Sequence, residues 1–376
     1  MTKSKTAACL LLAFAASGCF TTGEPAANAD DGGDAAADAT VAVDTGGATA
    51  ALPPLTAAEK AACVANPTGC LTGTAAASTF TTTPAQMTAK LYRVFPYGTE
   101  QPLGGPQLVD DAGTWGFGGL PDAGLDPWGH YYVQVEADFN VDAGVGAAVA
   151  AIVGPLGVPS SGQPIAVDVP PVQLNVLESR VPGGPMRLQW VLAHVFDPAS
   201  GAEIKGGPTW TVTIAIGGTS QPVPWSSADG GVGAYFFEFS TPPAAQPSYT
   251  VTVSGAEDGG APATFQLVAD EPAFDGAIVS PDNGASVPAN SPLSIVWTAE
   301  PQADYEVVQV FQSSGFASVY VSPQPDPPDQ TEETVDAGLE AGSYLINVSY
   351  AKTNCPATAS GCVQANTVSA ANVTAN

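Results

Sequence analysis

The sequence predicts an all-β protein in which three tandem antiparallel β-sandwiches follow a disordered N-terminal tether. Three observations support this prediction: apolar and polar residues alternate strictly in several segments, helical periodicity is nearly absent, and one strand pattern recurs along the chain. Alternation with period two places every second side chain on one face, as in a half-buried strand. The 41 Gly and 35 Pro among the 376 residues supply the turns that short strands need.

Two segments show the alternation most clearly, 209–216 and 293–297. Their bulky residues are β-branched, aromatic or leucine, and they occupy every second position: Trp210, Val212, Ile214, Ile216, Leu293, Ile295 and Trp297. Residues of this kind favour pleated surfaces that are buried on one side. We therefore expect Trp210, Trp297 and, by the same pattern, Trp115 to lie in hydrophobic cores.

The recurring pattern is a tyrosine followed by two apolar residues at alternate positions. It is found as Tyr131-x-Val133-x-Val135, Tyr249-x-Val251-x-Val253 and Tyr344-x-Ile346-x-Val348. The copies are separated by about the length of one sandwich domain, ~100 residues. This spacing places the three sandwiches at 78–180, 181–270 and 271–376.

A short segment, residues 55–77, precedes the first sandwich. Thr56-Ala57-Ala58-Glu59 has the form of a capping box and predicts a short helix that carries Cys63. Cys63 and Cys70 have six residues between them, as do Cys355 and Cys362, and both intervals contain Pro and Gly, which let the chain turn back. A zinc site is the alternative, but CxxC spacing is absent and no His lies near either pair. We predict two disulfides, each worth about 2.5 kcal/mol in the chain-entropy model.

The N-terminus has the form of a secretory signal peptide, residues 1–18. Lys3 and Lys5 precede a short apolar run that is far below the ~20 residues of a membrane span. Ala16-Ser17-Gly18-Cys19 resembles the lipobox of bacterial lipoproteins. The resemblance implies that Cys19 receives a lipid, becomes the mature N-terminus and holds the protein on the membrane. Phe20, where that family uses Asp for inner-membrane retention, implies an outer-membrane lipoprotein that faces the periplasm or the cell surface. Ordinary secretion, with cleavage near Ala16 or Gly18, is the alternative.

Residues 19–54 are rich in Ala, Gly, Asp and Thr and contain little bulky apolar surface, which predicts a disordered tether. The mature chain keeps 7 basic residues against 36 acidic ones, a formal charge of −29. A field of this sign repels phosphate backbones, so we expect no nucleic-acid partner.

Two sandwiches resemble known families. The stretch from Asp111 to Pro121, with Trp115 and Phe117 between two turns, resembles the D-x-x-G-x-[FW]-x-F-x-x-L-P stretch of carboxypeptidase-regulatory-like and prealbumin-type sandwiches. The third sandwich is similar to fibronectin type III and bacterial immunoglobulin-like domains through Leu293-x-Ile295-x-Trp297 and Leu339-x-x-Gly342-x-Tyr344. That resemblance implies that Tyr344 is a tyrosine-corner residue, which bonds back to the backbone. The middle sandwich fits the architecture without matching a subfamily.

Few residues have a pattern typical of catalysis. The two histidines, His130 and His194, fall at strand positions of different sandwiches, and the sequence has no HExxH, G-x-S-x-G, Walker or dinucleotide motif. Residues 138–149 begin like an EF-hand loop but have Ala143 and Val149 where Gly and Glu are required. The acidic loop 326–333 is expected to be a solvated loop, with calcium binding as the alternative. We predict a protein with no catalytic residues, no metal site and no cofactor.

These observations favour a non-enzymatic, lipid-anchored protein of the cell envelope that displays its sandwiches for interaction, adhesion or spacing. The expected partners are the membrane, through Cys19, and an envelope protein or polysaccharide. Glycan binding, with or without the aid of calcium, is the alternative function. Three aromatic residues beside turns could then stack on sugar rings: Trp128, Trp225 and Tyr235. Hydrolysis by a pair of carboxylates is a third hypothesis.

Overall fold

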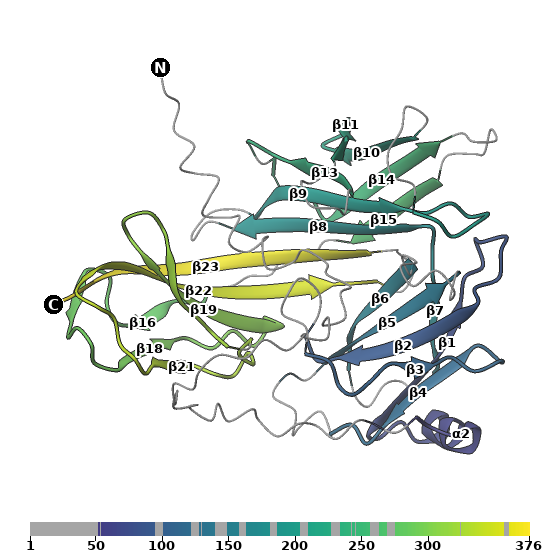
Figure 1. Ribbon diagram of the computed structural model, residues 1–376, viewed down its shortest axis with the longest axis horizontal. Coiled ribbons are helices and arrows are strands. Elements are labelled where there is room, and N and C mark those ends of the chain that lie inside the picture. The colour runs from purple at the N-terminus through teal and green to yellow at the C-terminus, as the bar shows by residue number, and fades with distance from the viewer. Residues whose placement is uncertain are drawn as a thin grey trace, which may run out of the picture.

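The computed structural model describes residues 52, 54–94, 101–121, 128, 130–139, 149–157, 163–180, 186–203, 210–226, 234–241, 243–244, 246–255, 263–268, 275–323, 325–356 and 361–376. The predicted signal peptide and nearly all of the predicted tether lie outside the described residues. Within these residues the chain forms strands and one helix, α2 (Ala57–Ala65), so the predicted all-β class is confirmed (Figure 1). The sheets stack in pairs, and the side chains that lie between the two sheets of each pair form three separate hydrophobic cores.

The first sandwich follows α2. One sheet has the order β4-β1-β7, with bounds Thr114–Gly118, Cys70–Ala76 and Ile165–Asp168. The facing sheet has the order β3-β2-β5-β6, with bounds Gln107–Leu108, Gln86–Tyr92, Tyr131–Asp138 and Val149–Leu156. Trp115 and Phe117 of β4 are buried in the core between these sheets, as predicted.

The second sandwich also has two sheets. One has the order β11-β10-β14-β15, with bounds Thr219–Val223, Trp210–Ile216, Ser248–Gly255 and Ala263–Val268. The strands that face it are β12-β13-β9-β8, with bounds Trp225–Ser226, Ala234–Glu238, Met186–Val195 and Val172–Arg180. Val212 and Ile214 of β10 are buried in this second core, as their alternation predicts.

The third sandwich has a small sheet, β16-β18-β21, with bounds Ile278–Ser280, Leu293–Trp297 and Glu332–Val335. It faces β23-β22-β19-β20, with bounds Gly361–Ala375, Gly342–Asn354, Tyr305–Gln312 and Ser318–Val321. A short strand, β17 (Ala285–Val287), pairs in parallel with the end of β23. Leu293, Ile295 and Trp297 are buried in this core, as predicted.

The three copies of the repeated pattern are equivalent strands. They form β5, β14 and β22, each of which lies inside a sheet, with a hydrogen-bonded neighbour on both sides. All nine tyrosine and aliphatic side chains of the pattern are buried, one set in each core. The hydroxyl of Tyr344 donates a hydrogen bond to the carbonyl oxygen of Glu340 at 3.0 Å, which is the expected tyrosine-corner contact.

The second and third sandwiches share one continuous sheet. Strand β8 pairs in parallel with β23, from Leu174 opposite Gly361 to Arg180 opposite Thr367. This pairing joins the strands into the order β12-β13-β9-β8-β23-β22-β19-β20, which crosses the upper and left parts of the molecule in Figure 1. We call it the central sheet. The second and third sandwiches are therefore not independent domains, because main-chain hydrogen bonds connect a strand of one to a strand of the other.

Two of the predicted domain boundaries differ from the structure. Strand β8 lies in the predicted first sandwich, 78–180, but Val172, Leu174 and Val176 are buried in the second core. Strand β1 lies in the segment 55–77, which we expected to stand apart, but it is the middle strand of a first-sandwich sheet. In addition, β1–β7, β8–β23 and β17–β23 are parallel pairs within the otherwise antiparallel pattern.

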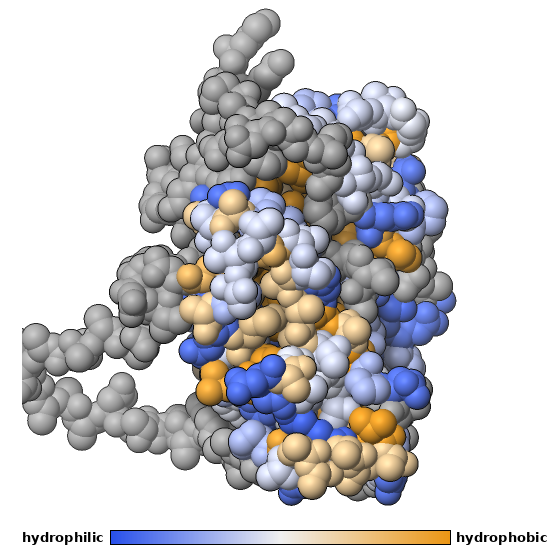
Figure 2. All heavy atoms as spheres, turned by 90° about the vertical axis from the view of Figure 1, so that its right-hand side faces the viewer, coloured by the Kyte–Doolittle hydropathy of each residue, from blue (hydrophilic) through white to orange (hydrophobic). Residues whose placement is uncertain are grey.

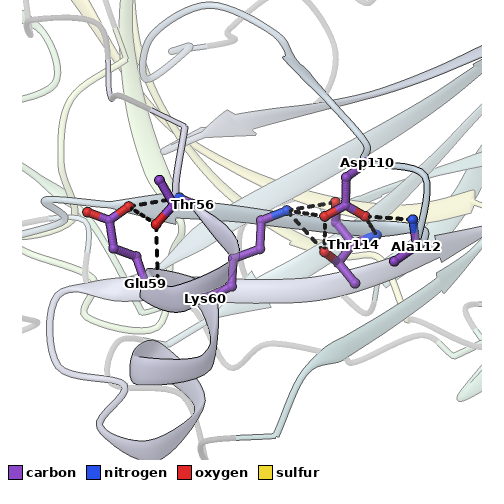
Figure 3. A network of polar contacts seen from close by, with 6 residues as sticks. All are labelled: Thr56, Glu59, Lys60, Asp110, Ala112 and Thr114. Atoms are coloured by element: carbon purple, nitrogen blue, oxygen red, sulfur yellow. Dashed lines mark hydrogen bonds and ion pairs between the residues drawn. The ribbon is translucent and has the colours of Figure 1, made fainter.

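Helix α2 is fastened to the first sandwich by its lysine (Figure 3). The predicted capping box is present between Thr56 and Glu59. Lys60 Nζ lies 2.8 Å from Asp110 Oδ2 and 3.0 Å from Thr114 Oγ1. Hydrogen bonds from Lys60 and Thr114 hold the pKa of Asp110 well below its usual range. Asp110 also accepts from the amide nitrogens of Ala112 and Thr114, so it orders the turn that leads into β4. Seen from the right-hand side of Figure 1, apolar residues are found in the middle of this face as well as toward its bottom, mixed with hydrophilic ones (Figure 2).

The first and third sandwiches meet at a buried seam. Tyr132 of β5 donates to Asp304 Oδ2 at 2.7 Å, and the amide nitrogen of Thr353 donates to the same oxygen. The main chains of Gly154 and Cys355 exchange hydrogen bonds of 2.9 and 2.7 Å. These contacts fix the first sandwich against one end of the central sheet, so all three sandwiches form one body.

Candidate functional site

The four predicted disulfide cysteines pair as expected, and Cys19 lies outside the described residues. Cys63 bonds to Cys70 and Cys355 bonds to Cys362. The second disulfide is buried at the seam, where it packs against three first-sandwich side chains: Tyr92, Tyr132 and Ile152. It therefore belongs to the joint between sandwiches as well as to its own loop.

The three aromatic residues proposed for sugar stacking are placed mainly inside the protein. Trp128 is 6% exposed and packs against Tyr305 and Val307 of β19, across the seam. Tyr235 is 2% exposed, in the second core, and Trp225 is half-buried with its ring edge against Tyr235, at a centroid distance of 5.1 Å. The expectation of exposed rings is wrong for Trp128 and Tyr235. Nearby turn residues suggested exposure, but a neighbouring sandwich and a paired strand cover these rings.

Both histidines contact carboxylates in the interior. His194 Nδ1 lies 2.7 Å from Glu203 Oε1, beside β9. His130 Nε2 lies 3.7 Å from Asp304 Oδ1, within the seam. The two rings therefore occupy separate structural positions, as the sequence predicts.

The acidic loop 326–333 does bring two carboxylates together. Ser322 Oγ lies 2.7 Å from Glu333 Oε2 and 3.2 Å from Asp326 Oδ2, and it accepts from the Val308 amide at 2.9 Å. A hydroxyl has one hydrogen to donate. Ser322 donates this hydrogen to the nearer carboxylate, Glu333. Asp326 therefore fits this arrangement best in its protonated form. The loop residue Asp326 is buried, in contrast to the solvated loop that we predicted.

A second buried carboxylate lies on the adjacent strand. Glu306 accepts hydrogen bonds from Trp297 Nε1 and from the amide of Glu300, and the main chains of Glu306 and Asp326 exchange hydrogen bonds. Burial raises the pKa of Glu306 to about 8. Burial, with the nearby Glu333 carboxylate, raises the pKa of Asp326 to about 7.

These raised pKa values predict that the protein loses stability as pH rises. From their ordinary values of 3.8 and 4.5, the pKa values of Asp326 and Glu306 rise on folding. Between about pH 4 and pH 8 the folded chain therefore binds more protons than the unfolded chain. The free energy of unfolding should fall across this window and level off above it. Urea denaturation at pH 5, 7 and 9 measures the effect, expected to be a few kcal/mol in total (~1.4 kcal/mol per pKa unit at most).

The variant Asp326→Asn separates this cause from general charge repulsion. It should raise the free energy of unfolding at pH 9 by about 1–2 kcal/mol, because it removes the buried charge, and change it little at pH 5. The exposed residue Asp329 on the same loop supplies the matched control, Asp329→Asn. Equal effects of both variants at pH 9 would contradict the assignment to Asp326.

Among the residues that the structure describes, no group of three or more His, Cys, Asp or Glu side chains is arranged to hold a metal ion. The calcium alternative for loop 326–333 therefore gains no support from the geometry. Asp138 ends β5, and residues 140–148 of the EF-hand-like segment lie outside the described residues.

The feature that sequence reasoning missed is a row of polar side chains on one face of the central sheet. Strand pairing places Gln309 opposite Asn347 and Val307 opposite Ser349, and side chains two residues apart share a face. The same rule and the pairing of β22, β23 and β8 add Thr353, Asn366 and Asn175 to this face. We call the set the amide face: Asn175, Gln309, Asn347, Ser349, Thr353 and Asn366. Its members come from strands that are far apart in the sequence, so no local sequence motif predicts it.

The polar atoms of the amide face are buried without partners. The side-chain oxygens of Asn175, Gln309, Asn347 and Asn366 find no hydrogen-bond partner within the described part of the chain, nor do the hydroxyls of Ser349 and Thr353. Five of these six residues are at most 7% exposed. Buried polar groups are almost always paired in folded proteins, so a row of unpaired ones marks the face as unusual.

No helix of the described residues is long and apolar enough to cross a membrane. No protein-family model matches the chain, and no curated protein sequence does either. Solved structures that are similar to it contain fibronectin type III domains. A structure of the CbhA fibronectin(III)-like modules of Clostridium thermocellum matches at 14% identity, over 27% of this chain and 93% of that chain, with a TM-score of 0.18.

Two chicken proteins show similar likenesses. The FN1-FN3 domains of CNTN1 match at 11% identity, over 77% of this chain and 90% of that one, with a TM-score of 0.24. The two-domain fibronectin type III segment of tenascin matches at 9% identity, over 50% and 92%, with a TM-score of 0.21. The class of protein is defined by the chain's own architecture: an all-β protein of three β-sandwiches.

Proposed function

We propose that this protein is a non-enzymatic lipoprotein of the cell envelope, anchored through Cys19, that displays its three sandwiches as one rigid body for interaction with other envelope components. The proposal joins the lipobox-like sequence before Cys19, the acidic segment 19–54 and the joined sandwiches. An anchored tether would hold the folded body away from the membrane at a distance set by its length.

The observation that supports display as a body is the pairing of β8 with β23. A string of sandwiches joined by linkers can bend at every junction. Here a main-chain ladder crosses the junction between the second and third sandwiches, and the seam at Asp304 and the Cys355–Cys362 disulfide fixes the first. A fixed body presents surfaces from all three sandwiches in one arrangement, which suits binding to a partner better than passive spacing.

The anchor is tested by substituting Cys19. In the full-length chain with its signal, Cys19→Ser should move the protein from the membrane fraction to the soluble fraction, because serine carries no thiol to receive the lipid. Cys9→Ser, within the same signal peptide, is the matched control and should leave the protein in the membrane fraction. Retention of the Cys19→Ser protein on membranes would show that another feature holds it there.

A further inference from the structure

Strand β20 leaves one edge of the central sheet open. Among the strands that the structure describes, it ends this sheet and pairs with β19 alone. The amide nitrogen of Ser322 donates to the carbonyl oxygen of Val308 on β19, at 2.9 Å. Because the main-chain groups of an antiparallel strand alternate between its two sides, those of Val321 face away from β19. Such an edge can pair with a strand of another chain.

The usual protections of an edge are weak on β20. Natural edge strands carry charges, prolines or bulges that oppose pairing. Residues 307–325 contain no charged residue, and the strand itself contains no proline. The one shift in register of the β19–β20 ladder lies between Ser318 and Tyr320. The strand from Tyr320 onward therefore keeps regular pairing and an open outer side.

Other outer strands are better protected. Strand β21 carries Glu332 and Glu333, and β11 contains Pro222. The outer strand β6 is covered in part, because the main chains of Gly154 and Cys355 exchange hydrogen bonds. Strand β20 has none of these features.

Strand β20 also presents two apolar side chains to solvent. Val319 is 43% exposed and Val321 is 46% exposed. Residues two apart in a strand share a face, so these side chains lie beside each other. In the described part of the chain, the other exposed large apolar side chains lie one to an element, on α2, β3, β13, β15 and β16. The apolar exposure is therefore concentrated at the open edge.

The sequence of this edge is complementary to a second copy of itself. Residues 318–322 have the sequence Ser-Val-Tyr-Val-Ser, which is the same in both directions. When two copies pair in antiparallel with Tyr320 at the two-fold axis, Val319 of each copy lies opposite Val321 of the other, and serine lies opposite serine. In this register the outward main-chain groups of Val321 meet the main chain of Val319 of the second copy. Strand β15, a second uncharged outer strand, lacks this symmetry.

Charge also favours a second copy as the occupant. The chain has a net charge of −27, so two copies repel each other over most of their surfaces. Along the chain, the charged residues nearest to β20 are Glu306 and Asp326, and both are buried. A charged partner strand finds no opposite charge on β20, whereas an identical uncharged strand brings no like charges into opposition.

We propose that this protein self-associates through β20, with two copies paired in antiparallel about a two-fold axis at Tyr320, so that two central sheets join into one. The inference adds a second copy of the chain as a partner to the proposed function. It does not depend on the anchor, because the test uses soluble protein. Pairing of one short strand buries less surface than a standard interface of ~1,600 Å². We therefore expect a reversible dimer with a dissociation constant of about 10–100 μM.

The test is sedimentation equilibrium of the soluble mature chain, carrying Cys19→Ser, from about 1 μM to about 500 μM. Val319→Lys should raise the dissociation constant at least about tenfold, because it places a charge at the paired edge. Gln266→Lys makes the same change of charge on the exposed surface of β15 and is the matched control. Both variants lower the net negative charge, so general repulsion alone would make both associate more strongly.

Three results would overturn the proposal: a monomer at every concentration, a dimer that Val319→Lys leaves unchanged, or a dimer that Gln266→Lys weakens equally. Val321→Pro is a second variant that leaves the charge unchanged. It removes an N–H that faces away from β19, so the β19–β20 ladder keeps its hydrogen bonds. The melting temperature of the monomer should stay within about 2 °C, while the dimer is lost. A dimer of unchanged affinity in Val321→Pro would also overturn the proposal.

Discussion

Gly361→Ala is expected to lower the free energy of unfolding by about 3 kcal/mol and to separate the second sandwich from the third. A Cβ atom at Gly361 would lie 1.5 Å from the carbonyl oxygen of Leu174 and 2.5 Å from its carbonyl carbon. Both are main-chain atoms of β8, so no side-chain rotation relieves the overlap. The first pair of the β8–β23 ladder must open, and a change of this size is typical of overpacking against fixed backbone.

Gly342→Ala is the matched control for this prediction. Gly342 begins β22 in the same sheet, and its nearest contact to an added Cβ is Tyr344 Cε2 at 3.5 Å, an ordinary van der Waals distance. Thermal and urea denaturation of both variants measure the difference. Equal stabilities would mean that β8 and β23 are not packed as closely as the parallel pairing requires.

Asp304→Ala is expected to weaken the seam between the first and third sandwiches by about 3–5 kcal/mol. Asp304 is 4% exposed, and its carboxylate accepts from Tyr132 of the first sandwich and from the Thr353 amide of the third. Alanine leaves both donors buried without their acceptor, and it removes the carboxyl oxygen that lies 3.7 Å from His130 Nε2. Removing one partner from a buried polar network costs more than the network itself contributes.

Two further variants locate this effect. Tyr132→Phe removes only the hydroxyl that crosses the seam and should cost about 1–2 kcal/mol. Asp282→Ala removes an exposed aspartate of the third sandwich and should change stability by less than about 0.5 kcal/mol. Limited proteolysis should release a first-sandwich fragment from Asp304→Ala first. Resistance equal to that of the unchanged protein would show that Asp304 does not hold the seam.

The repeat of Tyr131, Tyr249 and Tyr344 was enough to predict three cores, because a central strand that is buried on one face must alternate. Tyr344 and the capping box at Thr56 and Glu59 were equally readable, since each depends on neighbours within a few residues. The junctions between the sandwiches could not be predicted from local sequence in this way. Leu174 and Gly361 pair although about half of the chain separates them, and alternation in β8 does not say which sandwich it enters.

The candidate site residues divide in the same way, into features that local sequence predicts and features that depend on distant strands. The Cys63–Cys70 and Cys355–Cys362 disulfides are local and were predicted. Trp128 was misjudged because a neighbouring sandwich covers it, and a turn in the sequence gives no sign of that. The amide face could not be predicted, because Gln309 and Asn347 become neighbours only through pairing of β19 with β22.

The most direct test of the central claim, that the three sandwiches form one rigid body, is differential scanning calorimetry of the soluble mature chain. Joined sandwiches should unfold in a single cooperative transition, with the calorimetric enthalpy equal to the van't Hoff enthalpy. Gly361→Ala should divide that transition into two. Separate transitions in the unchanged protein, one for each sandwich, would contradict the claim.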